Sequence, residues 1–161
     1  MTGRYRPLLS TDSPGRLGAT TIFSVNLTCV RSDAESGAFR LSGYAAIQDV
    51  GRAINPPEAM GQIHGGVVQG LGRALGEQLV YSVDGQLRTS SFLDYELPTA
   101  DQLPDIDVRL IEVASAVGPL GAKGVGEPPA VPGPAAISNA LARATGIRVR
   151  DLPLDRAAFV R

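Results

Sequence analysis

The segment from Val117 to Pro129 has the composition of a shaped loop that could meet a ligand. Four glycines and three prolines surround Lys123, the only lysine of the chain, and Glu127. Glycines let backbone N–H groups approach an anionic ligand, and a carboxylate held between glycine and proline can serve as a general base when burial raises its pKa. The same composition also fits a tight linker in which both side chains are solvated. A phosphate-binding P-loop is excluded, because the Gly-Lys-Ser/Thr order is absent.

A second candidate surface lies on the helix that hydrophobic spacing predicts from Glu58 to about Tyr81. Its apolar stripe consists of residues that recur every four positions: Ile63, Val67, Leu71, Leu75 and Leu79. Gln62 and Gln69 fall on the opposite side. Six of the sixteen residues from 61 to 76 are glycine, although each interior glycine costs a helix about 0.5–1 kcal/mol. Two explanations stay open: tight packing of the helix on a sheet, or a ligand against the glutamine face.

Alternating hydrophobicity predicts an antiparallel hairpin upstream of this helix, with one buried face. The apolar positions are Phe23, Val25, Leu27 and Cys29 in the first strand, and Phe39, Leu41, Gly43, Ala45 and Ile47 in the second. An acidic turn ending at Gly37 joins the two strands. Cys29 falls on the apolar side, so we expect a buried thiol that packs as a small hydrophobic group.

Local signals predict the remaining elements. They are a helix N-cap at Asn55, a hairpin turn at Asp84-Gly85, a strand over residues 106–110, a helix from Pro134 to Thr145 closed by Gly146, and a short final strand over residues 147–150. The single histidine, His64, is expected to be a packed or interface residue. Together these elements predict an α+β fold with a mostly antiparallel sheet, one long Gly-rich helix and a short C-terminal helix. Residues 1–19 are predicted to form an extended lead-in.

Composition excludes several classes of protein. The 161 residues suffice for about one domain, and 43% hydrophobic with 19% charged residues is a globular composition. A net charge of −1 argues against a nucleic-acid binder with a basic surface. One cysteine and one histidine exclude an internal disulfide and metal sites that need several such ligands. No apolar run suggests a secretory signal or a membrane span, so we expect a cytoplasmic protein.

Four motifs follow one another along the chain: Asp49-Val50-Gly51 with Ile54-Asn55-Pro56, the run from Gly61 to Gly72, Asp94-Tyr95 with Pro98-Thr99, and the run from Gly121 to Pro128. In this order and spacing they resemble the C-terminal part of the large subunit of molybdenum hydroxylases, the family of xanthine dehydrogenase, aldehyde oxidase and carbon monoxide dehydrogenase. The resemblance runs from about residue 20 to about residue 155. It implies that residues 20–161 form a C-terminal segment of a molybdopterin-binding domain.

The resemblance also implies a cofactor and site residues. The family holds molybdopterin with molybdenum, often in the cytosine dinucleotide form, through backbone amides and glutamines. The implied cofactor contacts are Gln69, Gly70, Gln62 and the loop residues Ala122, Lys123, Gly124, Val125 and Gly126. Glu127 matches the active-site glutamate, which is not a metal ligand and takes the proton from a molybdenum-bound hydroxyl as it attacks a substrate carbon. The implied reaction is oxidative hydroxylation of an aldehyde or N-heterocycle with water as the oxygen source.

Partners follow from the same resemblance. Electrons leave through iron–sulfur clusters on a small subunit and FAD on a medium subunit, with a small-molecule substrate and neither nucleic acid nor membrane involved. The family's large subunit is several times longer, and its Gly-Gly-Phe-Gly-Gly motif is absent here. We therefore expect activity only with the remaining large-subunit segment, the chain being a split-gene subunit, a truncated product or a remnant. The alternatives are a non-catalytic fragment or interaction module without cofactor, and a binder of nucleotides or other anions through residues 118–128.

Overall fold

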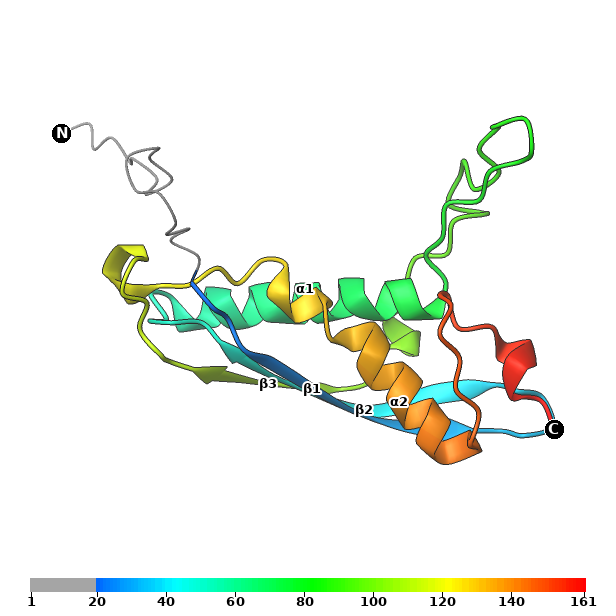
Figure 1. Cartoon of the computed structure of the whole chain (residues 1–161), viewed down its shortest axis with the longest axis horizontal. Helices are drawn as coiled ribbons and strands as arrows, with labels where there is room; N and C mark the ends of the chain where they lie inside the picture. The colour runs from blue at the N-terminus through cyan, green and yellow to red at the C-terminus, as the bar shows by residue number, and fades with distance from the viewer. Residues whose placement is uncertain (1–19) are drawn as a thin grey trace, which may run out of the picture.

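The computed structural model describes residues 20–161 as a three-stranded sheet with two α-helices on one face (Figure 1). The main elements are β1 (Ser24–Ser32), β2 (Phe39–Asp49), α1 (Pro56–Leu75), β3 (Ile106–Ile111) and α2 (Gly133–Thr145). Short 3₁₀ turns lie at Ala100–Gln102, Pro119–Gly121, Pro128–Ala130 (η3) and Arg156–Phe159. The predicted α+β class is confirmed, whereas the lead-in predicted over residues 1–19 lies outside the described residues. No helix within residues 20–161 is long and apolar enough to cross a membrane.

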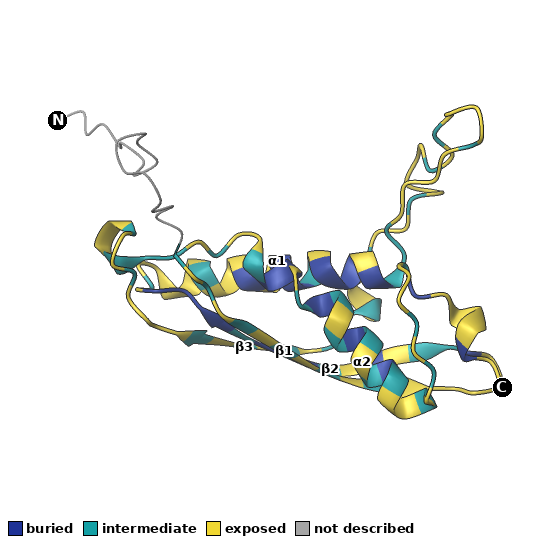
Figure 2. Ribbon diagram, in the orientation of Figure 1, coloured by how far each residue is buried: buried dark blue, intermediate teal, exposed yellow. Residues whose placement is uncertain are grey.

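The hydrophobic core fills the space between the sheet and the helices. Its fully buried members on the helices are Ile63, Val67, Leu71 and Ala74 of α1 with Ile137 and Leu141 of α2. They meet buried side chains of β2, and Figure 2 shows the buried segments of both helices in dark blue. The apolar stripe predicted for α1 is thus confirmed as far as Leu71, and Leu75 is half-buried beside it.

β2 is the central strand, with β1 and β3 on either side. β1 and β2 form the predicted antiparallel ladder, from Ser24 opposite Gln48 to Ser32 opposite Phe39, with an irregularity between Cys29 and Val30. β3 pairs parallel to β2, with Tyr44 opposite Ile106. A parallel pairing requires a crossover connection, which α1 and the following segment provide. The parallel partner was not foreseen from the sequence.

The buried face of β1 is the opposite of the predicted one. Phe23, Val25, Leu27 and Cys29 are exposed, whereas Ser24, Asn26 and Thr28 are half-buried. Two hydrogen bonds fix this orientation: Asn26 Nδ2 donates to the Tyr44 hydroxyl at 2.7 Å, and Thr28 Oγ1 donates to the Gly43 carbonyl at 3.1 Å. The expectation of a buried Cys29 thiol is therefore wrong, because polar side chains of β1 occupy the face toward the helices.

Helix α1 begins where the sequence predicts and ends early. The Asn55 side chain accepts a hydrogen bond from the Glu58 backbone N–H at 3.4 Å, and prolines occupy the first turn. At the other end, the N–H groups of Gly76 and Glu77 both donate to the Gly72 carbonyl. The helix therefore stops at Leu75 rather than near Tyr81, and Leu79 is an exposed residue outside it.

Two glycines of α1 allow a loop to lie directly on the helix. A Cβ added at Gly66 would lie 2.9 Å from the Pro129 Cβ, and one at Gly70 would lie 2.6 Å from the Ala130 carbonyl oxygen. Gly61 and Gly65, by contrast, have no heavy atom within 4 Å of such a Cβ. Close packing thus explains Gly66 and Gly70, but the close neighbour is η3 rather than the sheet.

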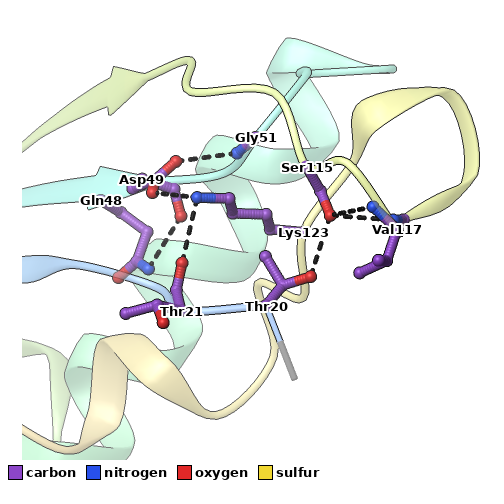
Figure 3. A network of polar contacts seen from close by, with 9 residues as sticks. Thr20, Thr21, Gln48, Asp49, Gly51, Ser115, Val117 and Lys123 are labelled. Atoms are coloured by element: carbon purple, nitrogen blue, oxygen red, sulfur yellow. Dashed lines mark hydrogen bonds and ion pairs between the residues drawn. The ribbon is translucent and has the colours of Figure 1, made fainter. Parts of the chain in front are cut away.

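A buried ion pair attaches the segment from Val117 to Pro129 to the end of β2 (Figure 3). Lys123 Nζ lies 2.6 Å from Asp49 Oδ2, and the two side chains are 6% and 3% exposed. Lys123 Nζ also donates to the Thr21 carbonyl at 3.0 Å. Burial alone would raise the pKa of the Asp49 carboxyl, but hydrogen bonds from Lys123 and the Gly51 backbone outweigh it and hold that pKa below its usual range.

Backbone contacts reinforce the ion pair. The Lys123 N–H donates to the Val50 carbonyl at 3.0 Å, and the Arg52 N–H donates to the Gly121 carbonyl at 2.9 Å. Gly51 adopts a positive φ of 65°, and a Cβ there would lie 2.4 Å from the Gly121 carbonyl oxygen. Only glycine permits this approach without strain, so the segment is held against β2 by both its backbone and its side chain.

Of the remaining predicted elements, the C-cap of α2 and the Asp84-Gly85 turn are confirmed and the final strand is wrong. Gly146 closes α2 in the left-handed conformation, and an antiparallel bridge between Tyr81 and Leu87 flanks the predicted Asp84-Gly85 turn. That turn belongs to an arm, residues 76–99, which projects from the body (Figure 1). The strand predicted over residues 147–150 is wrong: the segment is irregular, and Ile147 and Val149 pack against the core without a strand partner.

Replacing Gly70 by alanine should separate η3 from α1. The added Cβ would collide with backbone at Ala130, so we expect a loss of about 1–3 kcal/mol in unfolding free energy and faster amide exchange over residues 126–132. Gly65→Ala is the matched control, because its Cβ enters open space and removes a helix glycine, which should stabilise by about 0.5–1 kcal/mol. Equal stability of the two variants in denaturant titrations would contradict the packing described.

Removing both partners of the buried ion pair should cost less unfolding free energy than the sum of the two single removals. Asp49→Asn or Lys123→Met leaves a buried charge without its counter-charge, which typically costs about 3–5 kcal/mol. The double variant should lose clearly less than the sum of the two. Arg109→Met is the control, because the Arg109–Asp107 pair has side chains 72% and 56% exposed and should contribute less than about 1 kcal/mol. Additive losses in the double-mutant cycle would show that the two groups are not coupled.

The same pair should make stability depend on acid pH. Because the folded-state pKa of Asp49 is lowered, its contribution is fully present above the ordinary value of 3.8 and is lost as the pH falls through the folded-state value. The difference in unfolding free energy between the native chain and Asp49→Asn should therefore be constant above about pH 5 and shrink below it. Parallel pH profiles for the two proteins would refute this linkage.

Candidate functional site

A cavity of about 450 Å³ lies between the start of α1 and residues 122–126. Its volume falls within the range of about 300–1,000 Å³ typical of small-molecule sites. Five of the predicted site residues line it: Gln62, Ala122, Lys123, Val125 and Gly126. The side-chain amide of Gln62 is adjacent to the loop, since a Cβ added at Gly126 would lie 3.9 Å from Gln62 Nε2. The structure thus brings together helix and loop residues that are about sixty positions apart in the chain.

The donor set of this cavity suits one side of a pterin. An amide such as that of Gln62 offers two donors and one acceptor, which matches the mixed donor and acceptor edge of the heterocycle. Arg52 also lines the cavity, and a guanidinium is well suited to a phosphate group. Arg52 was not among the predicted site residues. The available signal was its place directly after Asp49-Val50-Gly51, the first of the four motifs.

Lys123 has a different environment from the one expected of an anion ligand. Its ammonium group is engaged by Asp49 and the Thr21 carbonyl, and its backbone N–H by Val50. Its charge is therefore neutralised inside the chain, although the residue lines the cavity. A cofactor contact from Lys123 remains a prediction, while its observed contacts hold the loop in place.

Glu127 is exposed and begins η3. It lines a second cavity of about 430 Å³ together with Ser24 and Pro128. Within residues 20–161 its side chain caps no backbone N–H of η3. Gly126 lines the first cavity and consecutive Cα atoms are about 3.8 Å apart, so the backbone of Glu127 adjoins that cavity, whereas Glu127 itself lines the second one. The packing of Pro129 and Ala130 on Gly66 and Gly70 holds this part of the loop beside α1, the helix that carries the glutamines.

Gln69, Gly70 and Gly124 lie outside the first cavity as it is formed by the described residues. Gln69 is exposed, seven residues beyond Gln62, which corresponds to about 10 Å along the axis of α1. Gly70 is buried under Ala130. Gly124 is exposed on the loop, with Ile22 as its neighbour. These three residues keep their predicted roles as predictions, and only Gln69 and Gly124 present surface to a group outside the described part.

A polar seam runs under η3, between the loop and the sheet. Asn26 Nδ2 donates to the Tyr44 hydroxyl and, at 3.4 Å, to the Pro129 carbonyl. Burial raises the pKa of Tyr44 to about 12, so its phenol stays neutral in ordinary buffers. In the described part of the chain Ser24 Oγ, Asn26 Oδ1 and Gln48 Oε1 are buried without a hydrogen-bond partner. Buried acceptors of this kind require a donor from water or from a bound group.

His64 joins α1 to β3. Its Nδ1 lies 2.8 Å from the Met60 carbonyl oxygen, and its Nε2 lies 3.2 Å from the Ile106 carbonyl oxygen. The side chain is exposed rather than packed in the core. Its contacts are thus structural ones between two elements of this chain.

Comparison with known proteins agrees with this geometry. The chain is 40% identical over 135 residues to the 6-hydroxypseudooxynicotine dehydrogenase complex subunit gamma of Paenarthrobacter nicotinovorans, covering 82% of this chain and 17% of that one. It is 44% identical over 112 residues to the nicotine 6-hydroxylase large subunit of the same organism, covering 70% and 14%. The chain thus spans less than a fifth of the length of these relatives.

Solved structures show the same fold. Quinoline 2-oxidoreductase from Pseudomonas putida superposes with a TM-score of 0.74 at 35% identity, over 80% of this chain and 17% of that one. The aldehyde oxidoreductase of Desulfovibrio desulfuricans gives 0.78 at 31% identity, over 86% and 15%.

The model of the molybdopterin cofactor-binding domain matches residues 1–104, a range that includes Gln62, Gln69 and Gly70 and stops short of the loop with Glu127. This match, together with the relatives above, shows that the chain belongs to the molybdopterin cofactor-binding domain family of the molybdenum hydroxylases.

Proposed function

We propose that the chain is the C-terminal molybdopterin-binding segment of a molybdenum hydroxylase large subunit, which oxidatively hydroxylates an aldehyde or N-heterocycle with water as the oxygen source. The observation that carries the proposal is the meeting of Gln62 with Ala122, Lys123, Val125 and Gly126 at one cavity, with the backbone of Glu127 following directly after Gly126. This juxtaposition supports a half-cradle for the cofactor next to a free carboxylate.

In this proposal Gln62 and the backbone of Ala122, Val125 and Gly126 hold the pterin, and Arg52 meets its phosphate. Gln69 and Gly124, which are exposed, add contacts, while Gly70 acts by letting Ala130 pack on α1. Molybdopterin, in its plain or cytosine dinucleotide form, would supply two-electron redox chemistry at molybdenum. Lys123 keeps the loop fixed through Asp49, so that the cradle has its shape before the cofactor arrives. Preorganisation of this kind lowers the entropy lost on binding.

Glu127 would accept, at a carboxylate oxygen, the proton of the water-derived hydroxyl that forms a bond to the substrate carbon. The substrate C–H bond would break in the same conversion, and its two electrons would pass to the bound cofactor. A carboxylate works best as a base when it is withdrawn from water, whereas Glu127 is exposed in this chain. Its shielding would therefore come from the cofactor, the substrate and the remaining large-subunit segment. An iron–sulfur small subunit and an FAD medium subunit would receive the electrons, with the cytoplasm as the expected compartment.

The test is reconstitution with the remaining large-subunit segment, followed by assays of bound molybdenum and of dye-linked oxidation of aldehydes and N-heterocycles. Glu127→Gln should keep complex and molybdenum and lower kcat by about 10²–10⁴-fold, the usual contribution of a general base. Glu35→Gln, in the exposed β1–β2 turn, is the matched control and should retain full activity.

Two results would overturn the proposal. Unchanged turnover of Glu127→Gln in a molybdenum-loaded complex would remove Glu127 as the base. A stable complex that takes up no molybdenum would favour a non-catalytic interaction module.

A further inference from the structure

The face of the sheet that points away from the helices carries an apolar strip. Phe23, Val25 and Leu27 are 68%, 52% and 59% exposed, and Cys29 continues the row. Ile47 of β2 lies directly opposite Val25 in the ladder and is half-buried. We call these five residues the outer strip. A sheet whose second face meets water normally carries polar residues there, so the outer strip requires another explanation.

Side-chain hydrogen bonds fix the pairing register of β1 and therefore which of its faces points outward. A shift of one residue would turn the apolar row toward the helices. Asn26 opposes such a shift through its bonds to the Tyr44 hydroxyl and the Pro129 carbonyl, and Thr28 through its bond to the Gly43 carbonyl. Asn26 Nδ2 and Thr28 Oγ1 thus have partners on the inner side, which commits the apolar row to the outer side.

The surroundings of the strip have the anatomy of an interface. Asp107 and Arg109 of β3 lie opposite Ala45 and Ile47 and form an exposed ion pair at 3.1 Å. An apolar centre with a charged, solvent-accessible rim is the usual arrangement at protein–protein contacts. The strip contains no basic residue, which argues against an anionic surface or nucleic acid as the occupant.

The size of the strip indicates what kind of partner covers it. Five side chains are far fewer than the roughly 20–30 residues per side of a free-standing interface. The arm presents a second exposed apolar set, including Val83, Phe92 and Leu93. A partner that engages several separate apolar surfaces of one chain is more like the rest of a subunit than a second, self-contained copy.

We propose that the outer strip is the surface covered by the part of the large subunit that lies outside this chain. The inference rests on the proposed function, since it takes the missing partner to be the remaining large-subunit segment. The lengths agree with it: the family match includes β1 and β2, yet the chain spans only 14–17% of the relatives cited above. Those relatives are several times longer than the region they share with this chain, so they contain ample polypeptide to cover the sheet.

Cys29 permits a direct test, because it is the only cysteine of the chain and lies on the strip. N-ethylmaleimide should alkylate it readily in the chain alone, and at least tenfold more slowly in the complex with the remaining segment, as followed by peptide mass spectrometry. The matched control is Cys29→Ser with Ala135→Cys, which moves the thiol to an exposed position on α2 and should keep its rate in the complex. Equal protection of both thiols would overturn the assignment of this particular face.

A substitution gives the second readout. Leu27→Asp should leave the circular dichroism of the chain unchanged, since Leu27 is exposed, and weaken association with the remaining segment at least tenfold. Ala135→Asp introduces the same charge on α2 and should associate normally. If the Leu27→Asp chain binds the remaining segment with native affinity, the inference about the outer strip is wrong. The proposed function would still hold in that case, provided that the complex contains molybdenum and is active.

The other outcomes are equally distinct. A complex that protects Cys29 but takes up no molybdenum supports this interface and refutes the proposed function. If the native chain forms dimers without the remaining segment, and Leu27→Asp abolishes these dimers, a second copy of the chain covers the outer strip. That result would overturn the inference. Failure of the native chain to associate with the segment at all overturns it as well.

Discussion

The buried contact between Lys123 and Asp49 is the constraint on which the candidate site depends. Two opposite charges withdrawn from water are tolerated only together, because either one alone would carry the full cost of its desolvation. The pair therefore holds residue 123 at the end of β2, with the Gly51 backbone adding a second attachment. The loop that follows has little freedom left, so the positions of Gly126 and Glu127 are consequences of an ion pair that does no chemistry itself.

The second feature that supports the site is a pair of glycines on α1, which leave room for η3. Gly66 and Gly70 let η3 lie against the helix, whereas Gly61 and Gly65 face open space. A helix with glycines at all four positions is intrinsically weak, and it is retained by the buried stripe of Ile63, Val67 and Leu71. Two of the glycines thus serve contacts within the chain. The other two, Gly61 and Gly65, face open space and are not among the residues that line the cavity with Gln62.

Sequence patterns predicted the elements better than their surroundings. Alternating hydrophobicity located β1 and β2 but gave the wrong buried face for β1. The inner face of β1 carries polar residues that form hydrogen bonds, and its outer face carries the apolar residues that are proposed to contact a partner. The end of α1 was misplaced, since Leu79 continues the spacing of the stripe after Gly76 has already stopped the helix. Neither the parallel partner of β3 nor the partner of Lys123, 74 residues away, leaves a local trace in the sequence. The cavity residues were suggested by resemblance to a family, and Arg52, which stands outside the expected contacts, emerged only from the fold.

The shape of the site is determined by contacts within this chain, whereas the shielding of the site and of the outer strip from water is not. Geometry is determined locally: the Asp49–Lys123 pair, the Gly51 turn and the contact of η3 with α1 all lie within residues 20–161. Desolvation is not, because Glu127 and the outer strip remain exposed to water in the same structure. Since a carboxylate becomes an effective base only when its environment is dry, covering the chain and activating Glu127 would be consequences of the same assembly step.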